Sequence, residues 1–244
     1  MKQSIYTIIK NEPLTSAVYR MVLAGDTSAI TKAGQFINIK LEGLFLRRPI
    51  SVCDYDEKTI TILYKIVGKG TAAMEKMPPQ THLDVLTGLG NGYDTAKSGS
   101  APLLIGGGVG VPPMYRLAKE LLAQGKIPTI ILGFNTKEEA FYVEEFTQLG
   151  VKVMVATADG SLGTKGFVTD IVKTLSEYTY FYTCGPEPML KALSACTLTS
   201  GQLSFEERMG CGFGACMGCS CATKYGNKRI CKEGPILEKE EILW

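Results

Sequence analysis

The sequence predicts an all-β unit, then an α/β unit, then a short C-terminal segment rich in cysteine. Three observations predict this fold class, α/β plus all-β. Short apolar, β-branched runs fill the first part of the chain, and strand patterns alternate with helical patterns in the second. Five of the eight cysteines then fall between residues 211 and 231. We expect the three parts to span residues 1–98, 99–200 and 201–244.

The runs in the first unit are short and separated by turn residues, which is typical of a small antiparallel barrel. The predicted strands lie at residues 4–9, 16–23, 34–41, 59–67 and 82–87. A boundary follows at 96–102, where the sequence AKSGSAP is small, polar and rich in helix and strand breakers.

The second unit changes to an alternation of strands and helices, which predicts a doubly wound parallel sheet. The expected strands are an apolar run before Gly106, then 128–134, 151–157 and 179–185. The expected helices cover 112–124, about 137–148, about 166–176 and a segment from Pro186. The last 40 residues fit neither pattern.

Composition excludes several functions. The 26 Lys and Arg nearly balance the 24 Asp and Glu, so no basic footprint for nucleic acid is present. The only histidine, His82, disfavours a multi-histidine metal site. No run is apolar enough for a signal peptide or membrane span, so we expect a cytoplasmic protein. Clustered cysteines there indicate metal binding or redox chemistry rather than disulfides.

The cysteine spacing is Cys211-x4-Cys216-x2-Cys219, with Cys231 following after eleven residues. This is the plant-type pattern for a [2Fe–2S] cluster, in which one tight loop supplies three of four thiolates. Glycines between these cysteines let the backbone approach the sulfurs. The alternative is a structural zinc site, although zinc sites usually show two separate cysteine knuckles. Cys221 is expected to be a non-ligand, and Cys53, Cys184 and Cys196 to pack in the core.

Two turns of the α/β unit are candidates for nucleotide binding. The first, Gly106-Gly107-Gly108-Val109-Gly110, joins a strand to a helix beginning near Pro112, an arrangement that receives a pyrophosphate. The second, Cys184-Gly185-Pro186, ends a later strand of the same sheet, so both would face one crevice. The alternatives are a merely tight strand–helix turn and a plain helix start.

Glu138 and Glu139 follow the second strand, where an adenosine ribose would lie. Their charge would repel a 2′-phosphate, which favours NAD over NADP, unless they are simply a solvated helix start.

The barrel unit carries Arg47-Arg48-Pro49-Ile50-Ser51 and the glycine turn Gly68-Lys69-Gly70-Thr71. Singly, these are an ordinary charged edge and a hairpin turn. A nicotinamide gives two electrons as hydride, whereas a [2Fe–2S] cluster takes one at a time, so a flavin between them is chemically required.

Five motifs, RRPIS, GKGT, GGGVGVPPM, TCGPEPML and MGCGFGACMGCSC with a trailing ICKEGP, occur in one order along the chain. In this order they resemble the ferredoxin reductase-like flavoprotein superfamily. More narrowly, the chain resembles the PyrK family, the electron-transfer subunits of dihydroorotate dehydrogenase B, over essentially its full length. The gap between the third and fourth cysteines is somewhat short for that family.

The resemblance implies an FAD-binding barrel, an NAD domain and a [2Fe–2S] segment. It assigns flavin contacts to Arg48, Pro49, Ile50, Ser51, Leu63, Tyr64, Lys65, Gly70 and Thr71. The cluster ligands would be Cys211, Cys216, Cys219 and Cys231. NAD+ or NADH would bind transiently at Gly106, Gly107, Gly108, Gly110, Cys184, Gly185 and Pro186.

The implied function is a relay in pyrimidine biosynthesis. An FMN-bearing partner would oxidise dihydroorotate, and electrons would pass through the cluster and FAD to NAD+ within a two-plus-two heterotetramer. This oxidoreductase subunit needs no catalytic residue of its own. One alternative is a reductase subunit of another complex, of the sulfide dehydrogenase, hydrogenase or NADH-dependent ferredoxin:NADP oxidoreductase type. Another is a redox-sensing or structural iron–sulfur protein without turnover.

Overall fold

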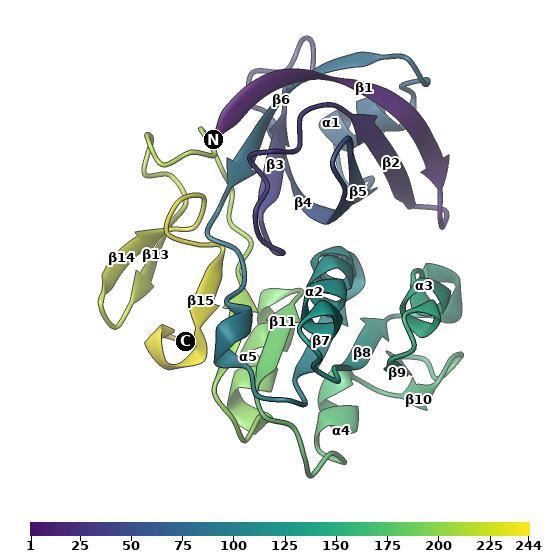
Figure 1. The fold of residues 1–244 in the computed structure, drawn as a ribbon, viewed down its shortest axis with the longest axis vertical. Coiled ribbons are helices and arrows are strands. Elements are labelled where there is room, and N and C mark those ends of the chain that lie inside the picture. Colours follow the sequence, from purple (N-terminus) through teal and green to yellow (C-terminus); the bar gives the residue numbers. More distant parts are fainter.

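The computed structural model describes all 244 residues and shows a barrel above a parallel sheet (Figure 1). The closed antiparallel barrel has the strand order β1-β2-β5-β4-β3-β6. Alternate side chains such as Tyr6 and Ile8, or Ile37 and Ile39, fill its interior. Its strands are β1 (Lys2–Pro13), β2 (Val18–Ala24), β3 (Phe36–Ile39), β4 (Arg48–Tyr55), β5 (Thr59–Lys65) and β6 (His82–Leu89).

The predicted strands of the barrel are present, but the sequence did not predict β4. The pair Arg47-Arg48 and Pro49 interrupt the apolar alternation, and this hid the strand that carries them. Helix α1 (Lys69–Glu75) lies between β5 and β6 and buries Met74 in the barrel core. The glycine turn expected after β5 therefore begins a helix rather than a hairpin.

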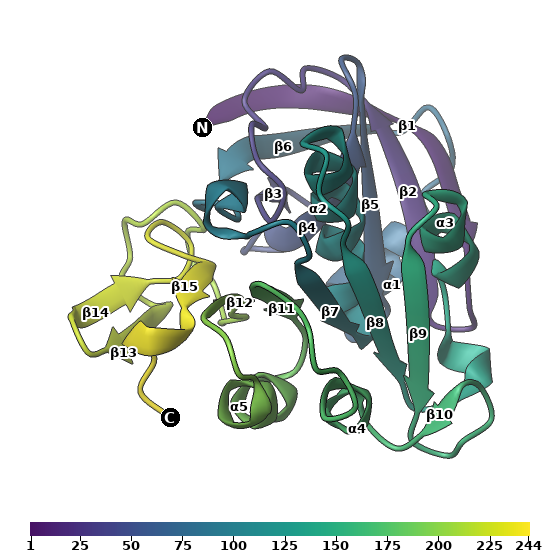
Figure 2. The ribbon, with the colours of Figure 1, turned by 60° about the horizontal axis from the view of Figure 1, so that its bottom comes forward.

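The second unit is a seven-stranded sheet with the order β10-β9-β8-β7-β11-β12-β15. All pairs are parallel except β12 with β15. Figure 2 shows α2 and α3 on one face and α4 and α5 on the other, which confirms the doubly wound prediction. The strands and helices to β11 are β7 (Leu103–Gly107), α2 (Val111–Ala123), β8 (Thr129–Phe134), α3 (Val143–Gln148), β9 (Lys152–Thr157), β10 (Thr164–Lys165), α4 (Val168–Val172) and β11 (Phe181–Cys184).

Two helices are shorter than expected. The predicted helix over 137–148 is wrong in its first half: a 3-10 turn at Lys137–Glu139 and an extended Ala140 precede α3. Tyr142 has φ 65°, a left-handed conformation that stops the helix from starting earlier. Helix α4 covers only Val168–Val172 of the predicted 166–176.

The C-terminal part is tied into the sheet at both ends. After α5 (Glu187–Cys196), β12 (Gly201–Ser204) pairs with β11, and β15 (Ile236–Glu238) pairs with β12. The prediction that this part fits neither pattern is therefore wrong at its ends. Four-residue and three-residue strands are too short to show a period in the sequence. Between them lies a hairpin of β13 (Ser220–Thr223) and β14 (Gly226–Arg229).

The barrel and the sheet share one interface, formed mainly by α2 and β4. Val18 and Leu63 of the barrel lie in one apolar cluster with Met114 and Leu117 of α2. Beside it, Asp54 pairs with Arg116 at 3.3 Å and Lys119 at 2.6 Å, both from α2. No helix combines the length and apolar character needed to cross a membrane.

Candidate functional site

The two glycine turns of the sheet unit lie side by side, since β7 and β11 are neighbours with Gly106 opposite Cys184. A Cβ on Gly110 would lie 2.1 Å from the Cys184 carbonyl oxygen, and one on Gly107 would lie 2.5 Å from the Met189 sulfur. At Gly110 the obstructing atoms belong to the backbone, so only glycine permits this approach. The structure therefore brings both predicted turns to one edge of the sheet.

The first turn ends at the N-terminus of α2, where Val111 is the first helical residue and Pro112 and Pro113 follow it. No side chain caps this end. Gly108 has φ +52° and nothing within 4 Å of an added Cβ, so the turn presents open backbone. Pro112 and Pro113 have no N–H to donate, so the helix dipole and the backbone of the glycine turn are what favour a phosphate at this end.

Glu138 and Glu139 lie in the 3-10 turn after β8, the strand beside β7. A side-chain hydrogen bond with Thr136 lowers the pKa of Glu138. The Glu139 carboxylate accepts a 2.9 Å bond from Asn135. Both carboxylates therefore lie at the end of the neighbouring strand, where the sequence analysis expected them.

The barrel motifs also meet. Residues Arg48–Ser51 form the first half of β4 and are partly exposed. A Cβ on Gly70 would lie 2.1 Å from Arg48 Nε, so α1 begins directly against the arginine. The Thr71 hydroxyl accepts N–H bonds from Val67 at 2.9 Å and Gly68 at 3.3 Å and fixes the turn.

The predicted flavin segment of β5 divides between two faces. Leu63 packs outside the barrel in the interface with α2, while the Tyr64 ring packs inside. The Tyr64 hydroxyl donates to Asn11 at 2.9 Å, and burial raises its pKa. Tyr64 therefore offers backbone rather than its ring to a ligand on the outer face, where Leu63 and Lys65 point.

The four predicted cluster cysteines form two pairs. The Cys211 N–H donates to Cys216 Sγ at 3.4 Å and the Cys216 N–H returns a bond to Cys211 Sγ at 3.5 Å. In the second pair, the Cys231 N–H donates to Cys219 Sγ at 3.4 Å. The second pair is buried, each member 2% exposed, whereas Cys216 is exposed.

The surroundings of the thiols differ between the pairs. Burial alone would raise the pKa of Cys211, but N–H donors from Phe213, Cys216 and Ala215 lower it to about 6. Burial and the neighbouring Cys219 thiol raise the pKa of Cys231 to about 12. A bound cation would reverse this second effect, because its charge deprotonates a coordinating thiol.

These pairs fit a two-iron group. No set of three or more His, Cys, Asp or Glu side chains converges as ligands of a single ion. A [2Fe–2S] cluster needs two thiolates for each of two irons, and its sulfurs accept N–H donors of the kind seen here. Since a structural zinc needs four ligands around one ion, the donor arrangement favours the cluster.

The remaining cysteines take no part in these hydrogen bonds. Cys221, on β13, has its thiol beside its neighbour's carbonyl, and burial raises its pKa. Cys53 is fully buried at the interface of the two units, and Cys184 ends β11 with its pKa raised to about 12 by burial. Cys196 is half-buried at the end of α5.

Sequence reasoning missed the link between barrel and cysteine loop. Asn38, on β3, donates from Nδ2 to the Cys211 carbonyl at 3.2 Å, across 173 positions of sequence. A single buried asparagine in an apolar strand gives no pattern that reveals such a partner.

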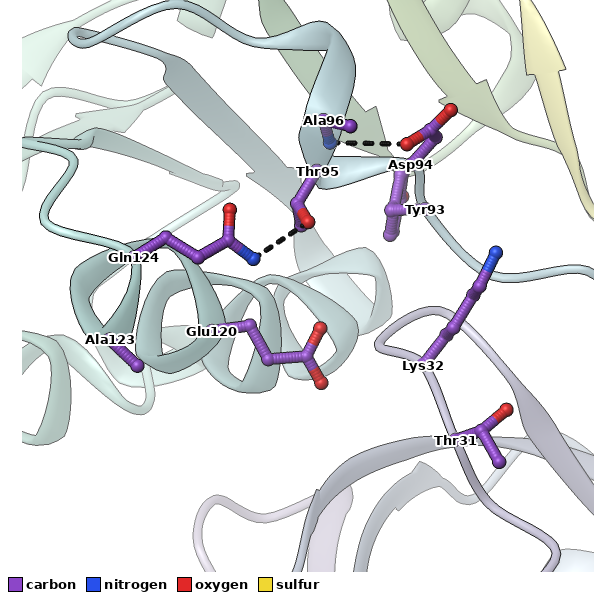
Figure 3. A pocket seen from close by; sticks show the side chains of 9 residues that line it. All are labelled: Thr31, Lys32, Tyr93, Asp94, Thr95, Ala96, Glu120, Ala123 and Gln124. Atoms are coloured by element: carbon purple, nitrogen blue, oxygen red, sulfur yellow. Dashed lines mark hydrogen bonds between the residues drawn. The ribbon is translucent and has the colours of Figure 1, made fainter.

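Hollows lie beside the cysteine loop and between the two units. One of about 430 Å³ lies between the barrel and the cysteine loop and is lined by Phe45, Leu46, Arg47, Gly210, Cys211, Phe213 and Cys216. The other, of about 440 Å³, lies where the chain crosses between the units and is lined by Thr31, Lys32, Tyr93, Asp94, Thr95, Ala96, Glu120, Ala123 and Gln124 (Figure 3). No predicted site residue lines the second hollow.

A barrel joined to a doubly wound sheet, with paired nucleotide-type turns and a four-cysteine loop, defines a reductase-type oxidoreductase. A solved structure of NADH-dependent reduced ferredoxin-NADP oxidoreductase matches 99% of this chain and 90% of its own, with TM-score 0.90 and 28% identity. A ferredoxin NADP+ reductase from Neisseria gonorrhoeae, with bound FAD and NADP, matches at TM-score 0.69 and 19% identity, covering 79% and 89% of the two chains. This second likeness concerns the fold alone.

Family models narrow the assignment. Residues 206–243 match the iron–sulfur cluster binding domain of dihydroorotate dehydrogenase B, and 104–195 match an oxidoreductase NAD-binding domain. The chain is 41% identical to the dihydroorotate dehydrogenase B (NAD(+)) electron transfer subunit of Geobacillus sp. (strain WCH70), over 100% of this chain and 99% of that one. The same subunit of Fusobacterium nucleatum is 42% identical, over 99% of each. The chain belongs to the family of dihydroorotate dehydrogenase B electron transfer subunits.

Proposed function

We propose that this chain relays electrons between an FMN-bearing dihydroorotate dehydrogenase catalytic subunit and NAD+, for pyrimidine biosynthesis. The carrying observation is that one cysteine loop lies against the barrel while two nucleotide-type turns meet at the adjoining sheet edge. FAD supplies the conversion between one-electron and two-electron transfer when bound. The residues of this chain bind and orient the cofactors and shield them from water. The acid–base chemistry belongs to the partner.

The flavin site is proposed on the outer face of β4 and β5. The Arg48 guanidinium, fixed against Gly70, suits a phosphate at the start of α1. Pro49 and Ser51 point outward on β4, because Ile50 between them packs toward the barrel core. Lys65 on β5 extends this face, whereas the Leu63 side chain is covered by α2 and offers only its backbone.

The nicotinamide nucleotide is proposed to bind transiently at the edge formed by Gly106–Gly110 and Cys184–Pro186. Its pyrophosphate would lie on the open backbone before α2. The acidic turn at Glu138 and Glu139 would meet the adenosine ribose and disfavour a 2′-phosphate. This supports NAD as the electron acceptor.

The cluster is proposed on Cys211, Cys216, Cys219 and Cys231, two thiolates to each iron. The outer pair lines the hollow beside the barrel, while the inner pair is buried. This gives the cluster one side toward the surface and one toward the protein, as a relay requires.

The partner is proposed to dock around the outer pair. Phe45 is fully exposed there, and Phe213 and Met217 are 43% and 56% exposed, an apolar grouping that a subunit interface would bury. Two catalytic and two electron-transfer subunits would form the assembly. All eight cysteines are free, which suits the reducing cytoplasm in which we place it.

The test starts with the purified chain under anaerobic conditions. We expect FAD and [2Fe–2S] absorption bands that bleach on addition of NADH. A colourless, zinc-containing protein would disprove the relay. Dihydroorotate should reduce NAD+ only when an FMN-bearing partner is added. If the native partner is instead a sulfide dehydrogenase, hydrogenase or ferredoxin:NADP oxidoreductase subunit, the chain serves that complex.

A further inference from the structure

Asn38 occupies an unusual position for a polar side chain. It is 1% exposed, in the middle of β3. Its neighbours Ile37 and Ile39 point into the barrel core, so Asn38 points outward, toward the cysteine segment. Directly opposite it on β4 is Pro49, and Ser51 lies opposite Phe36 on the same outer face. Asn38 therefore lies between the proposed flavin face and the cysteine loop.

The amide nitrogen of Asn38 has a hydrogen-bond partner within the chain. Nδ2 donates to the carbonyl of Cys211 at 3.2 Å. The next residue, Gly212, has φ +79°, and a Cβ there would lie 2.3 Å from Nδ2. The loop approaches the amide this closely only because residue 212 has no side chain.

The acceptor end has no partner. Asn38 Oδ1 is one of three buried side-chain oxygens without a hydrogen bond in the protein. A buried acceptor left unpaired is costly, and such groups usually meet a partner supplied from outside the chain. Because the outer face around Asn38 is the proposed flavin face, the available donor is an N–H or O–H of the bound flavin.

We propose that Asn38 is a positioning residue that joins the flavin to the cluster loop. Nδ2 holds the main chain of a cluster ligand, and Oδ1 accepts a hydrogen bond from FAD. This inference rests on the proposed function. With NADH as donor, FAD gains a hydride and a proton, then passes one electron at a time to the oxidised cluster and releases protons to solvent. No protein bond forms or breaks, so Asn38 acts by fixing the geometry of the second step.

The test uses the chain purified with FAD and cluster. Asn38→Leu keeps the size of the side chain but removes both polar ends, and Gly212→Ala displaces the loop from Nδ2. Asn38→Asp keeps an acceptor but removes the donor. The matched control is Asn91→Leu, because Asn91 also ties the C-terminal part down, through Glu233 and Ile236, without touching Cys211.

Stopped-flow spectra should separate the two steps. We expect NADH to reduce FAD within about twofold of the wild-type rate in the control Asn91→Leu, and the rate of this first step is measured separately in each of the other variants saturated with FAD. Cluster reduction should slow about tenfold or more in Asn38→Leu, Asn38→Asp and Gly212→Ala, because electron transfer depends on the relative placement of the two groups. FAD affinity should fall about threefold to tenfold in Asn38→Leu and be kept in Asn38→Asp.

Two measurements do not depend on turnover. Hydrogen exchange of the peptide covering 206–219 should quicken in Asn38→Leu and Gly212→Ala but not in Asn91→Leu. The electron paramagnetic resonance spectrum of the reduced cluster should shift in the same two variants.

The inference is overturned if the cluster of Asn38→Leu is reduced at the wild-type rate. It is also overturned if cluster reduction slows equally in Asn91→Leu, because the C-terminal part would then have been loosened as a whole. Should Asn38→Leu fail to fold, a wild-type second step in Asn38→Asp overturns it equally. A wild-type chain without cluster, or one whose FAD does not react with NADH, would instead disprove the proposed function.

Discussion

Gly110→Ala tests whether the joint between the two sheet turns is the nicotinamide site. Gly110 has φ −82°, which any residue adopts, so the substitution adds no backbone strain. Its new Cβ would lie 2.1 Å from the Cys184 oxygen, 2.3 Å from its carbonyl carbon and 2.6 Å from the Gly185 nitrogen. These are backbone atoms, and no rotamer change can relieve the collision. The turn at Cys184 must retreat by at least about 1.3 Å to restore ordinary contact.

Overpacking of this kind costs about 1–3 kcal/mol. If the substitution destabilises the NADH-bound protein by this amount relative to the free protein, NADH binds roughly tenfold to a hundredfold more weakly. A misplacement of about 1 Å can slow hydride transfer by a similar factor. The assay is anaerobic stopped-flow reduction of FAD over a range of NADH concentrations, with FAD content and cluster absorption measured alongside.

Gly108→Ala is the matched comparison for stability. Gly108 lies in the same turn at φ +52°, but nothing lies within 4 Å of its added Cβ. It should lose about 1 kcal/mol through the left-handed backbone alone, without moving the second turn. A Gly110→Ala chain that reduces FAD with wild-type NADH affinity and rate would refute the placement of the nicotinamide nucleotide.

Three further predictions concern the cluster, the interface and pH. Cys219→Ser should abolish the cluster absorption while NADH still reduces FAD, whereas Cys221→Ser should keep that absorption. Loss of the cluster absorption in Cys221→Ser would show that the proposed set of four ligands is wrong. Asp54→Asn should lower the unfolding free energy by about 1–3 kcal/mol in chemical denaturation, because Asp54 is the shared partner of Arg116 and Lys119; an unchanged midpoint would contradict this. Burial raises the pKa of Tyr182 to about 12, so its contribution to stability is complete below about pH 10 and disappears between about pH 10 and 12. Circular dichroism should follow that loss, with tyrosinate absorption as the check, and a flat alkaline profile would count against it.

The sequence predicted most of what depends on local pattern. Three such patterns depend only on residues close together in the sequence. They are the apolar alternation of the barrel strands, the change to alternating strand and helix patterns near Leu103, and the spacing of Cys211, Cys216 and Cys219. The glycine turns could also be found, because close approach and open backbone require glycine wherever the partner lies.

Features that depend on contacts distant in sequence could not be predicted. The left-handed Tyr142 that shortens α3 packs in an apolar cluster that also contains Cys53 of the barrel. The strands β12 and β15 are too short to show a period and are defined only by pairing with each other and with β11. The contact of Asn38 with Cys211 has no signature in either segment.

The pairing of β12 with β15 explains how a small cysteine segment can serve a relay. Ser204 lies opposite Ile236, so the chain leaves the sheet and returns to it at one point. Everything between, including all four proposed ligands, forms a loop closed at its base. Because β12 is also the neighbour of β11, that base lies beside the turn at Cys184. The Asn38 contact then fixes the far side of the loop to the barrel. With both sides anchored, the relative positions of the proposed cluster, flavin and nicotinamide sites follow from the sheet and the barrel, rather than from the loop's own small core.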